Sequence, residues 1–198
     1  MKILALSDIH GDRSFVREMA EKGADEKVDL VILAGDLVDH ENKLDGIVGP
    51  FKAKGLEVAV IPGNHEGLAE IGFLVEKYGV KNLHGYVIKK GDIGIFGCGY
   101  ADAGIHQLNE EDFFKTLKKG HESLEGIKKR IMVTHIQPSD SILGIGVWPG
   151  STGVRKAIEE FKPDLHLCGH IHESEGIEEV IGKTKVINVG KRGKIIEL

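Results

Sequence analysis

The strongest constraint on the fold is the regular alternation of short apolar segments with helical patterns over the first eighty residues. Apolar runs rich in β-branched residues indicate strands, whereas apolar residues spaced three and four apart indicate helices. Strand–helix alternation of this kind predicts βαβ units, in which the strands pair in parallel and the helices cover the sheet. The sequence therefore predicts an α/β fold that begins with a largely parallel sheet.

The remaining elements continue this pattern and then modify it. The expected strands are Lys2–Ser7, Asp29–Ala34, Glu57–Ile61, Tyr86–Lys90, Ile93–Cys98, Arg130–Thr134, Leu165–Cys168, Lys185–Val189 and Lys194–Glu197. The expected helices lie near Arg13–Lys22, Lys43–Lys54, Gly67–Tyr78, Glu110–Lys118 and Gly153–Phe161. Only Gly91 and Asp92 separate the fourth and fifth strands, which predicts a hairpin and thus a mixed second half. No linker rich in proline, serine or glycine interrupts the chain, so one domain over residues 1–198 is expected.

Composition limits the classes of function. Hydrophobic residues make up 41% and charged residues 29%, a balance typical of globular rather than disordered chains. Apolar stretches such as Leu30–Ala34 are too short to span a membrane, and the first residues do not resemble a signal peptide. The formal net charge of −5 argues against an extended nucleic-acid surface. Cys98 and Cys168 lie far apart, so two reduced thiols and a cytoplasmic location are expected.

Polar side chains follow five of the predicted strands at the point where each strand ends. In chain order they are Asp8 and His10, Asp36 and Asp39, Asn64 and His65, His135, and finally His170 and His172. Because ligands bind at the carboxyl ends of strands in open α/β sheets, we expect these side chains to converge. Carboxylate, amide and imidazole donors without cysteine suit Mn²⁺, Fe, Co²⁺, Ni²⁺ or Zn²⁺ better than Ca²⁺. The sequence therefore predicts a transition-metal centre.

The spacing within these groups supports metal ligation. Asp8 and His10 are two residues apart, as are His170 and His172, and residues i and i+2 of extended backbone point the same way. Each pattern alone has an ordinary explanation, such as a turn, a helix cap or a hydrogen-bonded core histidine. Their joint occurrence in one order favours a metal site.

This series of motifs resembles the signature of calcineurin-like metallophosphoesterases, and in particular the small, capless branch found in bacteria and archaea. The motifs are Asp8-x-His10, Gly35-Asp36, Gly63-Asn64-His65-Glu66, His135 and Gly169-His170-x-His172. The resemblance implies two mixed β-sheets packed as a sandwich and flanked by helices. It also implies two metal ions per chain, one held by Asp8, His10 and His172 and the other by Asn64, His135 and His170, with Asp36 between them.

The same resemblance implies roles for two further residues. His65 is expected beyond the metals as a catalytic residue that contacts the phosphate or protonates the leaving oxygen. Asp39 is the second candidate, and it either orients His65 or caps the next helix.

The activity implied by the resemblance is hydrolysis of phosphoesters by a hydroxide held between the two ions, with manganese the expected metal and Fe, Ni, Co or Zn as alternatives. A small phosphodiester or a nucleotide is the expected substrate, because the chain lacks a basic stripe for a duplex. The alternatives are a nuclease, a phosphomonoesterase, or a scaffolding protein that kept the fold and little catalysis. Homo-oligomerisation is left open.

Two irregular stretches, Gly99–Asn109 and Gln137–Thr152, are the candidates for substrate contact because long loops in compact domains are often functional. The second contains Trp148, the only tryptophan. Packing is the preferred interpretation of Trp148, and a platform for substrate is the alternative. The pair Lys191–Arg192 is expected to be solvated surface.

Overall fold

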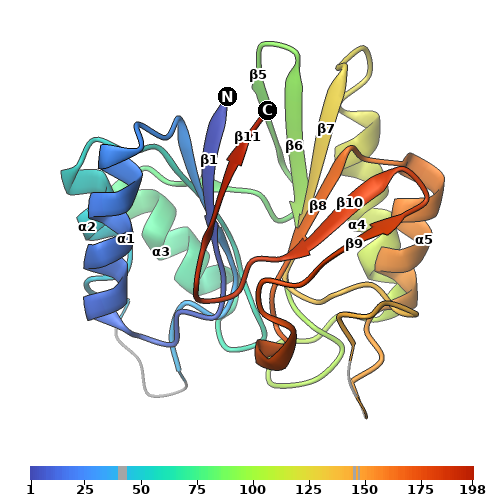
Figure 1. Ribbon diagram of the computed structural model, residues 1–198. Coiled ribbons are helices and arrows are strands. Elements are labelled where there is room, and N and C mark those ends of the chain that lie inside the picture. The colour runs from blue at the N-terminus through green and yellow to red at the C-terminus, as the bar shows by residue number, and fades with distance from the viewer. Residues whose placement is uncertain (40–43, 145, 147) are drawn as a thin grey trace.

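Two β-sheets pack face to face, with helices on the outer side of each, in the computed structural model, which describes residues 1–39, 44–144, 146 and 148–198 (Figure 1). The first sheet has the strand order β11-β1-β2-β3-β4. Its strands are β1 (Lys2–Leu6), β2 (Leu30–Ala34), β3 (Val58–Ile61), β4 (Lys81–Asn82) and β11 (Lys194–Glu197). The strands β1 to β4 pair in parallel, and β11 adds an antiparallel edge.

The second sheet has the order β5-β6-β7-β8-β10-β9. It consists of β5 (Val87–Lys90), β6 (Ile93–Cys98), β7 (Lys129–Thr134), β8 (Leu165–Cys168), β9 (Glu178–Ile181) and β10 (Thr184–Asn188). The pairs β5–β6 and β9–β10 are antiparallel, while β6, β7, β8 and β10 run in parallel. The predicted hairpin and the mixed second half are therefore confirmed, as is the α/β sandwich with flanking helices.

Three helices cover the first sheet and two cover the second (Figure 1). The first group comprises α1 (Arg13–Asp25), α2 (Gly49–Ala53) and α3 (Leu68–Tyr78), and the second α4 (Glu110–Glu122) and α5 (Thr152–Phe161). A short 3₁₀ helix, η1 (His172–Ser174), follows β8. None of the described helices combines the length and hydrophobicity that crossing a membrane requires.

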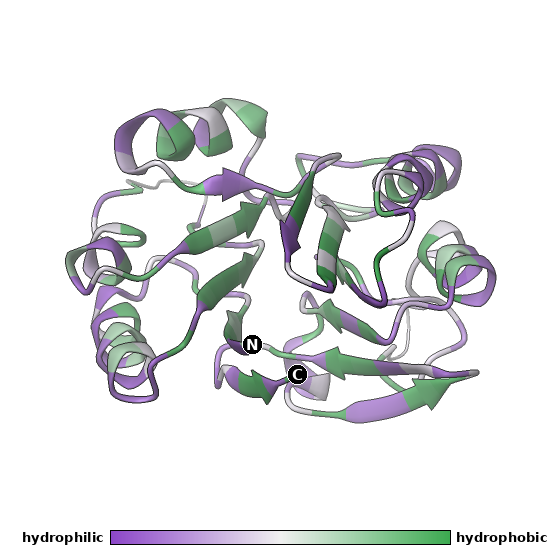
Figure 2. Cartoon of the chain, turned by 90° about the horizontal axis from the view of Figure 1, so that it is seen from above, coloured by the Kyte–Doolittle hydropathy of each residue, from purple (hydrophilic) through white to green (hydrophobic). Residues whose placement is uncertain are grey.

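Side-chain alternation along the strands builds the layered core. In β1, Leu4 and Leu6 pack with the helices of the first sheet, whereas Ile3 and Ala5 pack against the second sheet. A third cluster lies between the second sheet and its helices. Figure 2 shows the hydrophobic strands inside and hydrophilic residues on the outward faces of the helices. Because both faces of each sheet are covered, the central strands are buried throughout, which explains their continuous apolar sequences.

Two expectations about elements were wrong. The helix expected over Lys43–Lys54 begins only at Gly49, although Lys43 itself lies outside the described residues. Gly46 adopts a φ of +83°, which a right-handed helix excludes, and Pro50 suits a first helical turn. The strands β4 and β9 were missed because one has two residues and the other carries two glutamates instead of an apolar run.

Candidate metal centre

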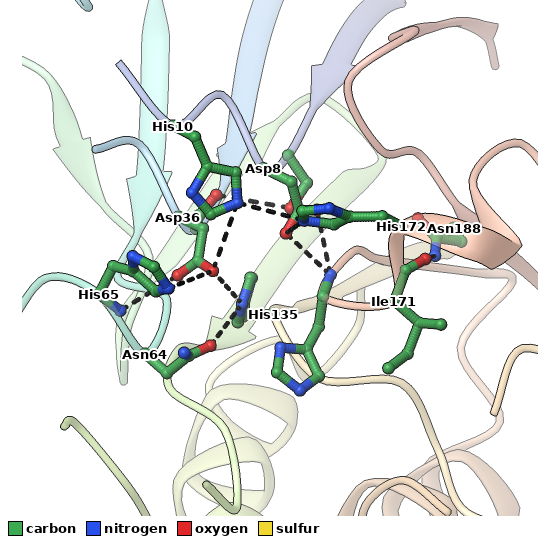
Figure 3. Close-up of polar contacts among 12 residues, drawn as sticks. Asp8, His10, Asp36, Asn64, His65, His135, Ile171, His172 and Asn188 are labelled. Atoms are coloured by element: carbon green, nitrogen blue, oxygen red, sulfur yellow. Dashed lines mark hydrogen bonds and ion pairs between the residues drawn. The ribbon is translucent and has the colours of Figure 1, made fainter. Parts of the chain in front are cut away.

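The loops after five parallel strands meet at one edge of the two sheets. The loop after β1 is held to the loop after β2, since Asp8 N donates to Gly35 O at 3.1 Å and His10 N donates to Asp36 O at 3.0 Å. The second sheet shows the same arrangement, because Gly169 N donates to His135 O at 2.9 Å. Side chains from both sheets therefore converge, as the sequence predicts (Figure 3).

Four of the predicted ligands adopt left-handed backbone conformations. The φ angles are +55° at Asp8, +48° at His10, +50° at Asp36 and +71° at His170. Residues other than glycine seldom occupy this region, and such strained residues cluster at functional sites. The fold thus holds these side chains in orientations that an ordinary strand end would not provide.

Two glycines allow the close backbone approach at this edge. A Cβ atom added to Gly63 would collide with the Asp36 carboxylate, and one added to Gly169 would collide with Ser7 and the Asp8 carboxylate. Both glycines therefore make space for the two carboxylates of the candidate site.

Three overlapping groups of histidine and aspartate side chains could hold a metal ion. They are Asp8, His10 and His172; His10, Asp36 and His65; and Asp36, His135 and His170. In each group the candidate ligand atoms lie within 4.8 Å of one another. The groups with His172 and with His135 lie at the two predicted metal positions. Asp36 belongs both to the group with His135 and to the group with His65. The donor set of carboxylate oxygen and imidazole nitrogen fits divalent transition metals.

His135 is oriented for ligation by a hydrogen bond on its far side. Its Nδ1 donates to the backbone carbonyl of Ala34 at 2.9 Å, which directs Nε2 into the site. Nε2 lies 3.1 Å from Asn64 Oδ1 and 3.4 Å from Asp36 Oδ2. A backbone carbonyl that fixes the histidine tautomer in this way is the usual arrangement behind a metal-binding imidazole.

In the first group, two imidazole nitrogens face each other. His10 Nε2 lies 3.2 Å from His172 Nε2, and His172 Nε2 lies 3.5 Å from Asp8 Oδ1 (Figure 3). Two ring nitrogens at this separation need a shared proton or a cation between them. Asp8 also accepts the backbone N–H of His170 at 3.0 Å, so it links the two halves of the site.

His65 and Asp39 lie beside this centre. His65 N donates to Asp36 Oδ1 at 3.1 Å, and its Nε2 lies 3.7 Å from Asp36 Oδ2. Asp39 Oδ1 lies 2.8 Å from His10 Nδ1 but 4.0 Å from His65 Nδ1. Helix α2 takes Val48 as its N-cap, so Asp39 does not cap it. The nearer partner of Asp39 is therefore a candidate metal ligand.

The pKa values follow from burial and mutual charge. Burial raises the pKa of the Asp36 carboxyl, but the surrounding histidines, above all His135, outweigh it and hold that pKa well below its usual value. Burial likewise lowers the pKa of His135, yet Asp36 raises it to about 10. Burial and then the charge on His135 lower the pKa of His170 to about 4. The hydrogen bond and charge of Asp8 also raise the pKa of His172, so carboxylates favour the charged imidazole in both halves of the centre.

Two buried residues support the site and were not recognised from the sequence. The Glu66 carboxylate accepts N–H groups from Gly63 at 2.9 Å and from Leu37 at 3.2 Å, so it joins two ligand-bearing loops. Burial, followed by the nearby Asp36, raises the pKa of Glu66 to about 7. Asn188 holds the loop of His170 and His172 from β10. Glu66 resembled an ordinary first-turn acid, and Asn188 lay inside a predicted strand.

Two residues at the rim of the site make contacts that bear on their predicted roles. Trp148 is 42% exposed and its ring meets the His170 ring edge to face at 6.0 Å, an arrangement compatible with both packing and a platform for substrate. The side chains of Lys191 and Arg192 are exposed, as predicted. Lys191 also lines a cavity of about 170 Å³ together with Asp8, His10, His172, Glu175 and Gly190. Its Nζ is held by Asp12 Oδ2 at 2.8 Å.

The chain belongs to the calcineurin-like phosphoesterase family, whose model matches residues 1–174. An uncharacterized protein of Methanocaldococcus jannaschii is 27% identical over 201 residues, covering 95% of this chain and 87% of the relative. An uncharacterized metallophosphoesterase of Helicobacter pylori is 28% identical over 195 residues, covering 88% of this chain but only 45% of that protein.

A crystal structure of a protein from Thermus thermophilus shares the fold, with a TM-score of 0.78 and 22% identity over 96% of this chain and 88% of the other. Family membership supports phosphoester hydrolysis. Members of the family typically bind divalent metals, and the clustered histidines and aspartates are the candidate ligands.

Proposed function

We propose that this protein is a metal-dependent phosphodiesterase that acts on small phosphodiesters or nucleotides. The observation that carries the proposal is the pair of ligand groups, Asp8/His10/His172 and Asp36/His135/His170, packed at one sheet edge with His65 beside Asp36. A pair of divalent transition ions bound there activates water and stabilises negative charge on phosphoryl oxygens.

The chain's own residues have distinct tasks in this proposal. Asp8, His10 and His172 hold one ion, and Asn64, His135 and His170 hold the other. Asp36 reaches both groups, since its Oδ2 lies 3.4 Å from His135 Nε2 and 3.9 Å from His10 Nε2. His65, with Nε2 directed at the centre, holds the proton that the leaving oxygen needs. Asp39 orients the His10 ring through the contact with His10 Nδ1, and it lies farther from His65.

Apart from the metals, the residues that line the cavity supply little positive charge, and a diester needs less of it than a monoester does. Lys191 is the one lysine or arginine among the described residues that line it, and it is already paired with Asp12. Asp8 and Glu175 contribute negative charge to the same lining. A phosphodiester carries one negative charge, whereas a monoester carries nearly two at neutral pH. The second charge would have little compensation beyond the metals.

The proposal takes residues 1–198 as one catalytic domain, because β11 near the C-terminus pairs with β1 at the start of the site. A reducing compartment such as the cytoplasm is supported by Cys98 and Cys168, which are both buried and unpaired. Manganese stays the first metal to test, and the oligomeric state stays open.

The proposal is tested on metal-stripped protein refilled separately with Mn²⁺, Ni²⁺, Co²⁺, Zn²⁺ and Mg²⁺. Hydrolysis of bis-p-nitrophenyl phosphate is compared with hydrolysis of p-nitrophenyl phosphate. Turnover of the diester is expected to return with one or more transition metals and to disappear in Asp36→Asn. Asp45→Asn is the matched control, since Asp45 is exposed and pairs with Lys77.

Two results would contradict the proposal in different ways. Full activity in Asp36→Asn would exclude the role given to that residue. Two bound ions per chain without turnover of either ester would favour a scaffolding protein that retains the fold.

A further inference from the structure

An exposed indole ring lies directly against the candidate metal centre. Trp148 is 42% exposed, although tryptophan is usually well covered in a folded protein. Its ring meets the His170 ring edge to face, with 6.0 Å between centroids. His170 belongs to the group with Asp36 and His135. Any substrate whose phosphoryl group is bound at that group therefore has its substituents within reach of the indole.

Hydrogen bonds hold the Trp148 carbonyl and the two ends of the loop that carries it. The Trp148 carbonyl accepts a hydrogen bond from Gln137 Nε2 at 3.1 Å, and Gln137 is fully buried. The base of the loop is tied by two backbone bonds of 2.9 Å, from Ser139 N to Ser151 O and from Ser151 N to Gln137 O. These bonds anchor the residue that carries the indole, and the ring itself contacts His170.

A second loop places apolar and aromatic groups beside the same half of the centre. His106 N donates to Asn64 O at 3.3 Å, which brings this loop onto another proposed ligand of the same ion. The His106 ring stacks on Tyr100, with 5.8 Å between centroids, and Ile105 is 67% exposed. The cation of the cavity, Lys191, lies instead beside Asp8, His10 and His172. The two halves thus differ in chemistry, one offering a cation and the other flat apolar surface.

We propose that Trp148 is a stacking platform for a planar aromatic group of the substrate, specifically a nucleobase, while the phosphoryl group lies at the metal ligands. This inference rests on the proposed phosphodiesterase function and specifies its substrate class as nucleoside phosphodiesters. Stacking on an aromatic side chain suits any base, because every base presents a π face. Alkyl diesters would gain nothing from the platform.

The first test reads Trp148 directly and needs no turnover. Trp148 is the only tryptophan, so emission excited at wavelengths that the three tyrosines do not absorb reports this one residue. Protein loaded with diamagnetic Zn²⁺ is titrated with AMP, ribose 5-phosphate and inorganic phosphate. AMP is expected to quench the emission and to bind about tenfold tighter than ribose 5-phosphate, which corresponds to about 1.4 kcal/mol. Equal affinity for the two, or unchanged emission at saturating AMP, would overturn the proposal.

The second test compares diesters that share one leaving group. The p-nitrophenyl ester of thymidine 5′-phosphate, phenyl p-nitrophenyl phosphate and methyl p-nitrophenyl phosphate differ only in the other substituent. Trp148→Ala is expected to lower kcat/KM about tenfold for the thymidine and phenyl esters and to leave the methyl ester unchanged. Trp148→Phe should retain most of the difference, because it keeps an aromatic face.

The controls separate this proposal from the broader one. Ile142→Ala changes an exposed residue of the same loop and should affect no ester selectively. An equal loss for all three esters in Trp148→Ala would show that the ring merely supports His170, and a loss confined to the phenyl ester would overturn the nucleobase assignment. Failure of every ester in the wild-type protein would contradict the phosphodiesterase function, whereas the emission titration would still decide whether Trp148 binds a base.

Discussion

The side-chain amide of Asn188 donates a hydrogen bond of 2.7 Å to the backbone carbonyl of Ile171, the residue between His170 and His172 (Figure 3). The same amide donates to Ser174 Oγ at 2.9 Å. Asn188 is fully buried at the end of β10, so these bonds join the loop of the two histidines to the second sheet. One side chain that never faces the centre therefore positions a proposed ligand of each ion.

Replacing Asn188 should weaken metal binding as well as the fold. Asn188→Ala leaves the Ile171 carbonyl without its donor, which should lower the free energy of unfolding by about 1–3 kcal/mol. Because the loop is released, metal affinity should fall too. Urea unfolding and metal titration measure the two effects. Asn82→Ala is the control, since Asn82 caps His84 N away from the centre. Reduced stability with unchanged metal affinity in Asn188→Ala would show that the loop is positioned by other contacts.

The position of Asp39 predicts an effect on metal binding rather than on proton transfer. Asp39 Oδ1 is 2.8 Å from His10 Nδ1 but 4.0 Å from His65 Nδ1. Asp39→Asn should therefore reduce metal affinity, because a carboxylate behind a ligating imidazole raises its basicity. The pH profile of turnover by the metal-saturated variant should match the wild type. A displaced profile with intact metal affinity would instead assign Asp39 to His65.

Metal binding should release a proton from His135. In the metal-free protein, Asp36 overcomes the effect of burial and raises the pKa of His135 to about 10, so its imidazole is charged at pH 7. Ligation requires the neutral ring, and the proton must leave. Metal affinity should accordingly weaken as the pH falls below about 10. A pH indicator in weakly buffered solution measures the release, which should drop by about one proton per chain in His135→Gln. Equal release by both proteins would contradict this assignment.

The convergence of the candidate ligands could be predicted because these residues follow strands, and the ends of parallel strands meet in space. Asp8 and Asp36 are two such cases. The partner of Asp39 could not be predicted, since it depends on the left-handed backbone at His10. The role of Asn188 could not be predicted either, because Asn188 ends a strand whose other residues are typical of a hydrophobic core. The contact of Gln137 with the Trp148 carbonyl could not be predicted, because it joins two positions of an irregular loop.

Acid should destabilise the protein through His166, which lies outside the metal centre. His166 is fully buried against Thr134 Oγ1, 2.7 Å from its Nε2, and burial lowers its pKa to about 3. The unfolded chain has the ordinary value of 6.5, so it binds a proton first as the pH falls. Above about pH 6.5 His166 therefore does not affect how the free energy of unfolding depends on pH. Below that pH it lowers the free energy of unfolding by up to about 1.4 kcal/mol per pH unit. Urea unfolding between pH 7 and pH 4 gives the slope of the free energy of unfolding against pH. In His166→Leu this slope should correspond to about one fewer proton taken up on unfolding. An identical slope would exclude His166 as the acid-sensitive group.

Stability should also rise at a position far from the chemistry. Lys162 ends α5 in a left-handed conformation, with φ +49° and ψ +55°, and its N–H bonds to Ile158 O. A Cβ atom is unfavourable in this region, whereas glycine enters it freely. Lys162→Gly should therefore raise the free energy of unfolding by about 0.5–1 kcal/mol without altering turnover. Lys162→Ala is the matched control, because it removes the same charge but keeps the Cβ atom. If alanine stabilised the protein as much as glycine, the gain would come from removing the lysine side chain and not from relief of backbone strain.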